Sequence, residues 1–154
     1  MTATVQLRIA LHKNSFDPYS LIADWEQELA LQQHGPSAAE SLFIGRVRAN
    51  SSEGSPLSAL ELEHYPGMTE RQLQELASRC CARHMAASCL IAHRIGRVYL
   101  GEAIVLVAIG EDRRGQAQRC CQELLEALKH DAPFWKREWR TDGSHAWLRG
   151  NTPF

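Results

Sequence analysis

The chain has 154 residues, of which 44% are hydrophobic and 23% are charged, as is typical of a soluble globular protein that buries one core. Its 17 basic and 18 acidic residues give a net charge of −1, so no global field favours binding to nucleic acid or to a membrane. The first ten residues do not resemble a signal peptide, and no apolar stretch is long enough to span a bilayer. We therefore expect a single cytoplasmic domain over residues 1–154.

Strand and helix patterns alternate in the first part of the chain. Residues 5–11 alternate between apolar and polar side chains, which predicts a strand. Helical spacing of apolar residues begins after Pro18 and ends at the sequence His34-Gly35-Pro36, which predicts a helix between them. Two more strands are predicted over residues 41–48, which end in basic side chains, and over residues 57–65 after a polar loop.

A second helix and two longer strands are predicted next. Thr69 and Gln72 have the spacing of a capping box, which predicts that the helix begins at Thr69. Residues 88–100 and 102–109 are rich in apolar side chains, and Gly101 between them indicates a turn. Each of these two segments should therefore form one strand.

The end of the chain contains one more helix and two short strands. Apolar side chains at helical spacing predict a helix over residues 114–130, which Pro133 prevents from continuing. The strands are predicted over residues 134–140 and 145–148. Because the strands and helices do not follow a regular βαβ order, the sequence predicts an α+β fold.

The five cysteines do not form the pattern of a metal or redox site. Their number is odd, and no Cys-x-x-Cys pair or zinc-finger spacing is present. Both adjacent pairs lie in predicted helices beside core leucines, where reduced thiols pack as small apolar groups. We expect a structural role and no metal for these residues, which are Cys80, Cys81, Cys89, Cys120 and Cys121.

Two lysines flank Pro133 and allow two interpretations. Lys129 lies in the last turn of the last predicted helix, and Lys136 follows seven residues later in a predicted strand. They are either a helix-end cation and a solvated strand lysine, or two ammonium groups that the turn at Pro133 brings into one pocket. In a shared pocket, burial and mutual repulsion would lower a lysine pKa, so that the group can exchange protons near neutral pH.

Two arginine pairs are candidates for binding an anion. Arg46 and Arg48 flank Val47 and would share one face of a strand. Arg113 and Arg114 lie at the start of the last predicted helix, where backbone amides and guanidinium groups together suit a phosphate. A solvated basic turn is the alternative for the second pair, and the residues alone do not decide between the two.

Four stretches of the chain resemble signature sequences of the large subunit of molybdopterin synthase. Three of them are specific and occur in the order and at the spacing typical of that family. They are Leu62-Glu63-His64-Tyr65-Pro66-Gly67-Met68-Thr69, His93-Arg94-Ile95-Gly96 and Ala132-Pro133-Phe134-Trp135-Lys136-Arg137-Glu138. The fourth, looser stretch is Phe43-Ile44-Gly45-Arg46-Val47-Arg48, and the resemblance as a whole covers about residues 40–148.

The resemblance implies an α+β fold of the α/β-hammerhead type with an additional antiparallel β subdomain. It also implies a sulfurtransferase of molybdenum cofactor biosynthesis that requires no metal or cofactor. The partners would be a second large subunit, in a homodimer, and a small ubiquitin-like sulfur-carrier subunit at each end, in a heterotetramer. The C-terminal thiocarboxylate of the carrier would supply two sulfur atoms to cyclic pyranopterin monophosphate (precursor Z), forming the dithiolene of molybdopterin.

The resemblance also assigns roles to residues. Lys129 and Lys136 match the two active-site lysines of the family and are the expected catalytic residues. The expected substrate-binding residues are Arg46, Val47, Arg48, Arg113, Arg114, Lys129, Lys136, Arg137 and Glu138. Arg113 departs from the family, which typically has a histidine there, and an arginine can bind phosphate but does not titrate near neutral pH.

Two rival functions remain. A non-catalytic module of the same fold would bind the carrier without performing chemistry, although the presence of both Lys129 and Lys136 argues against it. A cysteine-based sulfurtransferase would use Cys120 or Cys121, although both lie beside core leucines. Turnover of precursor Z with a thiocarboxylated carrier separates these possibilities.

Overall fold

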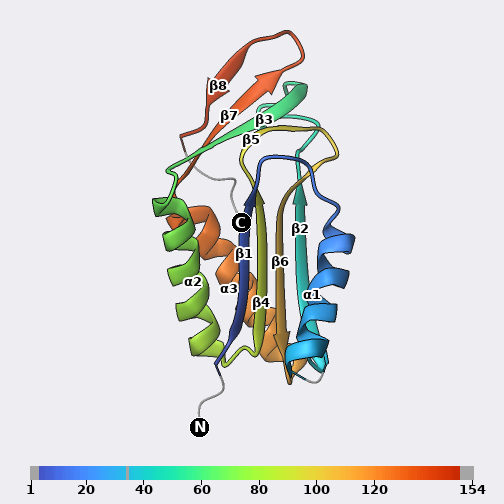
Figure 1. The fold of residues 1–154 in the computed structure, drawn as a ribbon. Coiled ribbons are helices and arrows are strands. Elements are labelled where there is room, and N and C mark those ends of the chain that lie inside the picture. Colours follow the sequence, from blue (N-terminus) through green and yellow to red (C-terminus); the bar gives the residue numbers. More distant parts are fainter. Residues whose placement is uncertain (1–3, 34, 150–154) are drawn as a thin grey trace.

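The computed structural model describes residues 4–33 and 35–149, which form two sheets and three helices (Figure 1). The helices are α1 (Pro18–Gln33), α2 (Met68–His84) and α3 (Arg114–Asp131). The strands are β1 (Gln6–His12), β2 (Ala39–Arg46), β3 (Leu57–His64), β4 (Ser88–Arg94), β5 (Gly96–Tyr99), β6 (Ala103–Glu111), β7 (Phe134–Arg140) and β8 (His145–Trp147). The predicted α+β fold with an additional antiparallel sheet is confirmed, while the predicted helix end at His34 lies outside the described residues. None of the described helices is long and apolar enough to cross a bilayer.

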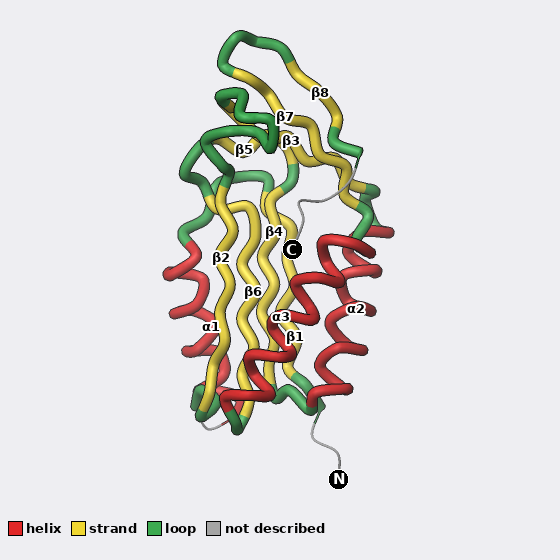
Figure 2. The backbone as a smooth tube through the Cα atoms, turned by 180° about the vertical axis from the view of Figure 1, so that it is seen from behind, coloured by secondary structure: helices red, strands yellow, loops and turns green. Residues whose placement is uncertain are grey.

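The first sheet has the strand order β1-β4-β6-β2 and is covered on both faces. β1 and β4 run parallel, whereas β6 is antiparallel to both of its neighbours. The central strands β4 and β6 are almost continuously buried, because helices cover both faces of the sheet. Helix α1 packs on one face, and α2 and α3 lie side by side on the other (Figures 1 and 2).

Alternation of side chains along the strands divides the core into two layers. Leu90 and Leu106 point toward α1, where Trp25 is only 1% exposed. Ile91 and Val107 point toward α2 and α3. All five cysteines belong to this second layer, and they are buried and unbridged. Their burial makes them part of the apolar packing of this layer.

The second sheet lies across one end of the first and has the antiparallel order β5-β3-β7-β8 (Figure 1). The prediction of one strand over residues 88–100 is wrong, because the chain leaves the first sheet after β4 and enters the second as β5. Gly96 allows this turn, since its φ of 78° lies in a region that other residues rarely adopt. The buried Arg94 holds the turn through hydrogen bonds from its guanidinium group to the backbone oxygens of Lys13 and Arg97.

The cap of α2 lies two residues before the predicted position. Gly67 is the N-cap, and its backbone N–H donates to the carboxylate of Glu70. Thr69 is fully buried, and its hydroxyl accepts from the N–H of Tyr65 at 2.9 Å and donates to the carbonyl of Pro133 at 3.3 Å. The capping-box prediction at Thr69 is therefore wrong, because this hydroxyl ties the start of α2 to the loop before β7.

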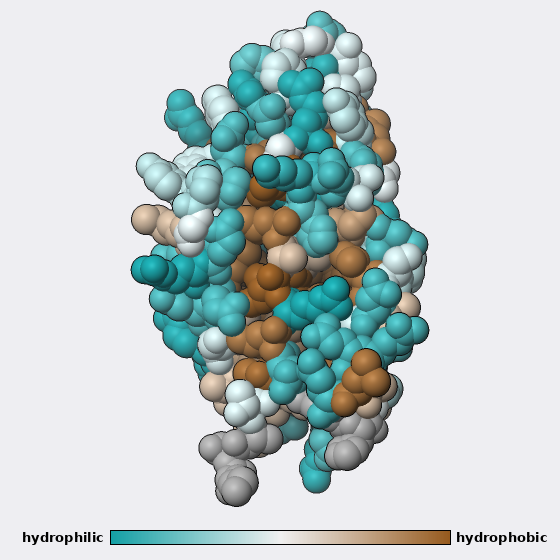
Figure 3. All heavy atoms as spheres, viewed as in Figure 1, coloured by the Kyte–Doolittle hydropathy of each residue, from teal (hydrophilic) through white to brown (hydrophobic). Residues whose placement is uncertain are grey.

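β1 forms one edge of the first sheet. On the face that Figure 3 shows, apolar side chains gather along the middle of the molecule, over the strip where β1 runs in Figure 1. Leu7, Ile9 and Leu11 of β1 are only partly buried and pack against the layer of α2 and α3. This edge therefore combines apolar surface with backbone groups that can pair.

Candidate active site

A pocket of about 320 Å³ lies where the second sheet meets the ends of the first sheet and of α3. Most of its lining side chains are apolar, and its charged side chains come from three separate segments. The lining residues are Phe43, Gly45, Arg46, Val47, Arg48, Leu57, Leu60, His93, Ile104, Val105, Leu125, Leu128, Lys129, Ala132, Phe134, Lys136, Glu138 and Leu148. A cavity with apolar walls and a few convergent polar groups is suited to a small ligand.

β7 presents alternate residues to the pocket. Phe134, Lys136 and Glu138 line it, because every second side chain of a strand lies on the same face. In the pairing of β3 with β7, Lys136 lies opposite Leu62 and Glu138 lies opposite Leu60. The two charged side chains of β7 therefore stand beside buried leucines.

The two lysines that flank Pro133 both line this pocket. Lys129 lies one turn after Leu125 on α3, so both side chains project from the same face of the helix. Only Ala132 and Pro133 separate α3 from β7, so the chain turns back toward the pocket at once. Burial lowers the pKa of Lys136, and the positive charge of Lys129 lowers it further. Lys136 therefore releases a proton more readily than a solvated lysine does.

The end of β2 contributes three of the predicted substrate-binding residues to the pocket. Arg46 is the last residue of β2, and Arg46, Val47 and Arg48 all line the cavity. Val47 is buried and packs with Leu60 and Val98, whereas the two arginines are exposed. The arginines thus form a basic rim, where planar guanidinium groups can bind an anion with two hydrogen bonds.

Arg137 lies on the face of β7 that points away from the pocket. Its Nε donates to the carboxylate of Glu61 at 2.7 Å, and Glu61 is its direct partner in the β3–β7 pairing. The guanidinium group also lies over the rings of Trp139 and Trp147, 4.9 and 4.7 Å from their centroids. The structure therefore does not bring Arg137 to the pocket, although both of its neighbours in the chain line it.

Arg113 and Arg114 lie at the opposite end of α3 from the pocket. Arg113 is the N-cap, with an extended backbone, and Arg114 is the first residue of the helix. Because a helix rises about 1.5 Å per residue, Arg114 is about 22 Å from Lys129 along the helix axis. A single chain does not bring this arginine pair to the pocket.

The sequence prediction omitted His93, which lines the pocket from the end of β4. The residue is 6% exposed, and its ring stacks on Phe134 with 4.0 Å between the ring centroids. Burial lowers the pKa of His93 to about 4; the hydrogen bond to the Arg94 carbonyl opposes this shift, and the charge of Lys136 adds to it. The neutral ring donates from Nδ1 to that carbonyl at 2.8 Å, which leaves a lone pair on Nε2.

The chain is similar in sequence to proteins of one family. A family model described as MoaE protein matches residues 15–131. A curated relative from Ralstonia nicotianae, named molybdopterin synthase catalytic subunit, is 41% identical over 69% of this chain and 60% of its own length. A relative of the same name from Vibrio cholerae is 36% identical over 92% of this chain and 89% of its own length.

Solved structures with the same fold carry related names. A molybdopterin biosynthesis MoaE protein from Burkholderia ambifaria has a TM-score of 0.74 and 32% identity, and the match covers 98% of this chain and 93% of that one. A complex of subunits 1 and 2 of molybdopterin-converting factor from Helicobacter pylori contains a chain with a TM-score of 0.73. That match covers 93% of this chain and 90% of the other, and its identity of 18% supports a shared fold alone.

Proposed function

The chain belongs to the MoaE protein family, and we propose that residues 1–154 form one catalytic domain of a molybdopterin synthase. It transfers sulfur from the C-terminal thiocarboxylate of a small ubiquitin-like carrier subunit to cyclic pyranopterin monophosphate. The observation that carries this proposal is the gathering of Lys129, Lys136, Arg46 and Arg48 around one largely apolar pocket.

The composition of the pocket suits the two anions that this reaction brings together. The tail of the carrier ends in a thiocarboxylate and the pterin carries a phosphate, so both require nearby cations. Arg46 and Arg48 on the exposed rim are suited to the phosphate, and the less exposed Lys129 and Lys136 are suited to the reacting groups. Apolar walls that include Phe43 exclude water from this space, which strengthens the attraction between opposite charges.

The reaction requires proton transfer rather than a protein nucleophile. The sulfur anion of the thiocarboxylate attacks a pterin carbon and forms the C–S bond, and the oxygen that leaves this carbon must be protonated. Lys136 can supply and recover this proton, because burial and the charge of Lys129 lower its pKa. Lys129 stabilises the anionic tail. Water then cleaves the acyl–sulfur bond, which releases the carrier as a carboxylate and leaves the sulfur on the pterin.

The proposed assembly is a homodimer that binds one carrier at each end. Arg113 and Arg114 are about 22 Å from Lys129 of their own chain, so we assign them to the pocket of the neighbouring subunit. The small second subunit is part of the proposal, by analogy with the complex of subunits 1 and 2 of molybdopterin-converting factor from Helicobacter pylori. The assembly is assigned to the cytoplasm, where five reduced cysteines are stable.

Mixing two inactive variants tests the assignment of Arg114. We expect Lys136→Ala and Arg114→Ala each to impair every pocket of its own homodimer. In a mixed dimer, one of the two pockets combines an intact Lys136 with an intact Arg114 from the other subunit. Random equimolar mixing makes about half of the dimers mixed, so about a quarter of all pockets should regain activity. If both residues act within one chain, mixing restores no activity.

The rival functions require features that differ from those of this pocket. A non-catalytic module would bind the carrier without turning over the pterin. A cysteine-based sulfurtransferase would need an accessible thiolate, but Cys120 is fully buried and burial raises the pKa of the Cys121 thiol. Neither cysteine lines the pocket.

Single-turnover conversion of precursor Z with a thiocarboxylated carrier tests the catalytic assignment. Lys129→Ala and Lys136→Ala should each slow conversion about 10²-fold or more, the scale of a lost acid–base group, while the carrier still binds. Lys13→Ala is the matched control, because Lys13 is the one other lysine of the sequence and does not line the pocket. Unchanged rates in both pocket variants would exclude the lysines from the mechanism, and a wild-type chain that binds the carrier without turnover would favour the binding module.

A further inference from the structure

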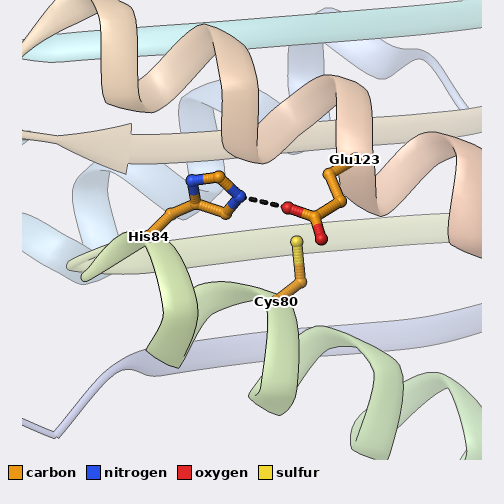
Figure 4. Close-up of side chains that lie close together, drawn as sticks. All are labelled: Cys80, His84 and Glu123. Atoms are coloured by element: carbon orange, nitrogen blue, oxygen red, sulfur yellow. Dashed lines mark hydrogen bonds and ion pairs between the residues drawn. The ribbon is translucent and has the colours of Figure 1, made fainter.

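A second group of reactive side chains lies outside the pocket, in a groove between α2 and α3. Cys80 and His84 come from α2, and Glu123 comes from α3 (Figure 4). The sulfur of Cys80, a ring nitrogen of His84 and a carboxylate oxygen of Glu123 all lie within 4.8 Å of one another. Figure 4 shows that the three side chains point toward a common centre.

The geometry of the two helices explains this convergence. Cys80 and His84 are four residues apart, so they lie one turn apart on the same side of α2. Glu123 reaches this turn from α3: one of its carboxylate oxygens contacts Nε2 of His84, and the other pairs with Arg83. Cys80 is 3% exposed, whereas His84 and Glu123 are partly exposed. The group is therefore closed toward the core and open toward the groove.

The sequence alone predicts a structural role and no metal for Cys80, but from this convergence we propose that Cys80, His84 and Glu123 bind a zinc ion. Thiolate sulfur, imidazole nitrogen and carboxylate oxygen are the three ligand types that Zn²⁺ accepts in tetrahedral sites. Mg²⁺ and Ca²⁺ are disfavoured, because they prefer sites made of oxygen ligands. Three protein ligands leave a fourth position for water or a small anion, which can enter from the groove of about 380 Å³ beside Cys80 and Glu123.

A second carboxylate lies buried at the end of β6, on the side of the sheet that α2 and α3 cover. Glu111 at the end of β6 is 1% exposed, and its two carboxylate oxygens have no hydrogen-bond partner among the described residues. Alternation along β6 places it on the same face as Ile109, toward α2 and α3. Burial raises the pKa of Glu111, and the nearby His84 opposes this shift. The structure shows no hydrogen bond between Glu111 and His84, so the proposal includes that His84 donates its second N–H to Glu111 when the ion is bound, as histidine ligands of metals commonly do to a carboxylate.

A salt-bridge network alone accounts for fewer of these observations. The contacts among Arg83, His84 and Glu123 would join the two helices without a metal, but they do not require Cys80 and leave the carboxylate of Glu111 unexplained. The Cys80 thiol donates a hydrogen bond to the carbonyl of Cys120 at 3.6 Å, so it is a protonated donor in this arrangement. A divalent ion displaces the proton of a coordinating thiol, so binding must release a proton.

A bound ion would fix α2 to α3 six residues before Lys129. The unfolded chain does not hold the three ligands together, so an ion that binds only the native state raises the stability of the fold. The ion would therefore hold in place the helix that carries Lys129, which lines the pocket. The proposed site does not depend on the reaction assigned to that pocket.

The test is a titration of the full-length chain, stripped of metal by a chelator and kept reduced, with Zn²⁺ alone. We expect one zinc per chain, release of a proton and a higher melting temperature. Co²⁺ should occupy the same place and produce thiolate-to-cobalt charge-transfer absorption, which Cys80→Ser should abolish. Glu111→Gln should weaken zinc binding about 10–100-fold, as loss of the partner of a metal ligand does.

His130 and Glu126 offer a matched control in the same groove. They form an ion pair at 3.3 Å on α3 but have no role in the proposed site, so His130→Ala should bind zinc as the wild type does. If Cys80→Ser does not fold, Glu123→Gln at the partly exposed rim provides the same test, and it should also weaken binding. Absence of zinc binding, or binding unchanged by the ligand substitutions, would overturn the proposal.

Discussion

Replacing His93 by asparagine should remove part of the pH dependence of the stability of the fold. The native state keeps this imidazole neutral, because burial lowers its pKa from 6.5 to about 4. Between these two values the unfolded chain binds a proton that the native chain does not bind, so the free energy of unfolding decreases as the pH falls. Asparagine can still donate to the carbonyl of Arg94, but it does not titrate.

The magnitude follows from the two pKa values. A difference of about 2.5 pKa units corresponds to about 3 kcal/mol in the free energy of unfolding. This contribution to stability is fully present above about pH 6.5 and fully lost below about pH 4. Solvent does little to weaken this effect, because His93 is only 6% exposed. The substitution also removes the stacking on Phe134, but that loss is the same at every pH. The pH-dependent part can therefore be separated from it.

Urea unfolding at a series of pH values measures this difference. The wild type is expected to lose about 3 kcal/mol relative to His93→Asn as the pH falls from about 7 to about 4. The exposed His130, changed to asparagine, is the control and should leave most of the wild-type profile in place. A free-energy difference between wild type and His93→Asn that stays constant with pH would refute the claim that the native ring is neutral.

Two further predictions concern other charged groups. Arg48→Ala should weaken binding of the pterin substrate by about 1.5–3 kcal/mol, the scale of a lost charged hydrogen bond, as measured by titration calorimetry. Arg71→Ala on the exposed side of α2 is the control and should not weaken binding. Equal affinities in wild type and Arg48→Ala would remove Arg48 from the substrate site. The pKa of Glu40 is raised from 4.5 to about 7 by burial, by a hydrogen bond with Glu26 and by the charge of Glu26. Between these two values the native state holds a proton that the unfolded state releases. The free energy of unfolding therefore decreases as the pH rises through this range. Glu40→Gln should therefore raise the melting temperature relative to wild type at about pH 8 more than at about pH 5, and an equal effect at both values would contradict the raised pKa.

The approach of Lys129 to Lys136 could be predicted from the sequence because its cause is local. Apolar spacing defines the face of α3, and Pro133 ends the helix within two residues of Asp131. The alternation of β7 then determines which of its side chains share a face with Lys136. Each of these steps depends on neighbours in the chain, so short-range patterns were sufficient to place the two lysines.

The break between β4 and β5 and the role of His93 could not be predicted in the same way. Apolar residues continue on both sides of Ile95, because Val98 of β5 is as deeply buried as the residues of β4. The periodicity of apolar residues indicates that a side chain is buried but not which sheet buries it. The passage from the first sheet to the second is marked by the positive φ of Gly96. His93 precedes this break, and its place in the pocket depends on Phe134, which is distant in the sequence.

The register of β7 against β3 determines which charges enter the pocket. A shift by one residue would turn Lys136 and Glu138 outward and bring Arg137 inward, because side chains alternate across a strand. The opposed pair of Glu61 and Arg137 resists this shift, since their ion pair across the two strands depends on the observed register. The resemblance to the family assigns three consecutive residues, Lys136, Arg137 and Glu138, to substrate binding. Strand geometry instead places Lys136 and Glu138 in the pocket, and Arg137 holds them in position from the opposite face of β7.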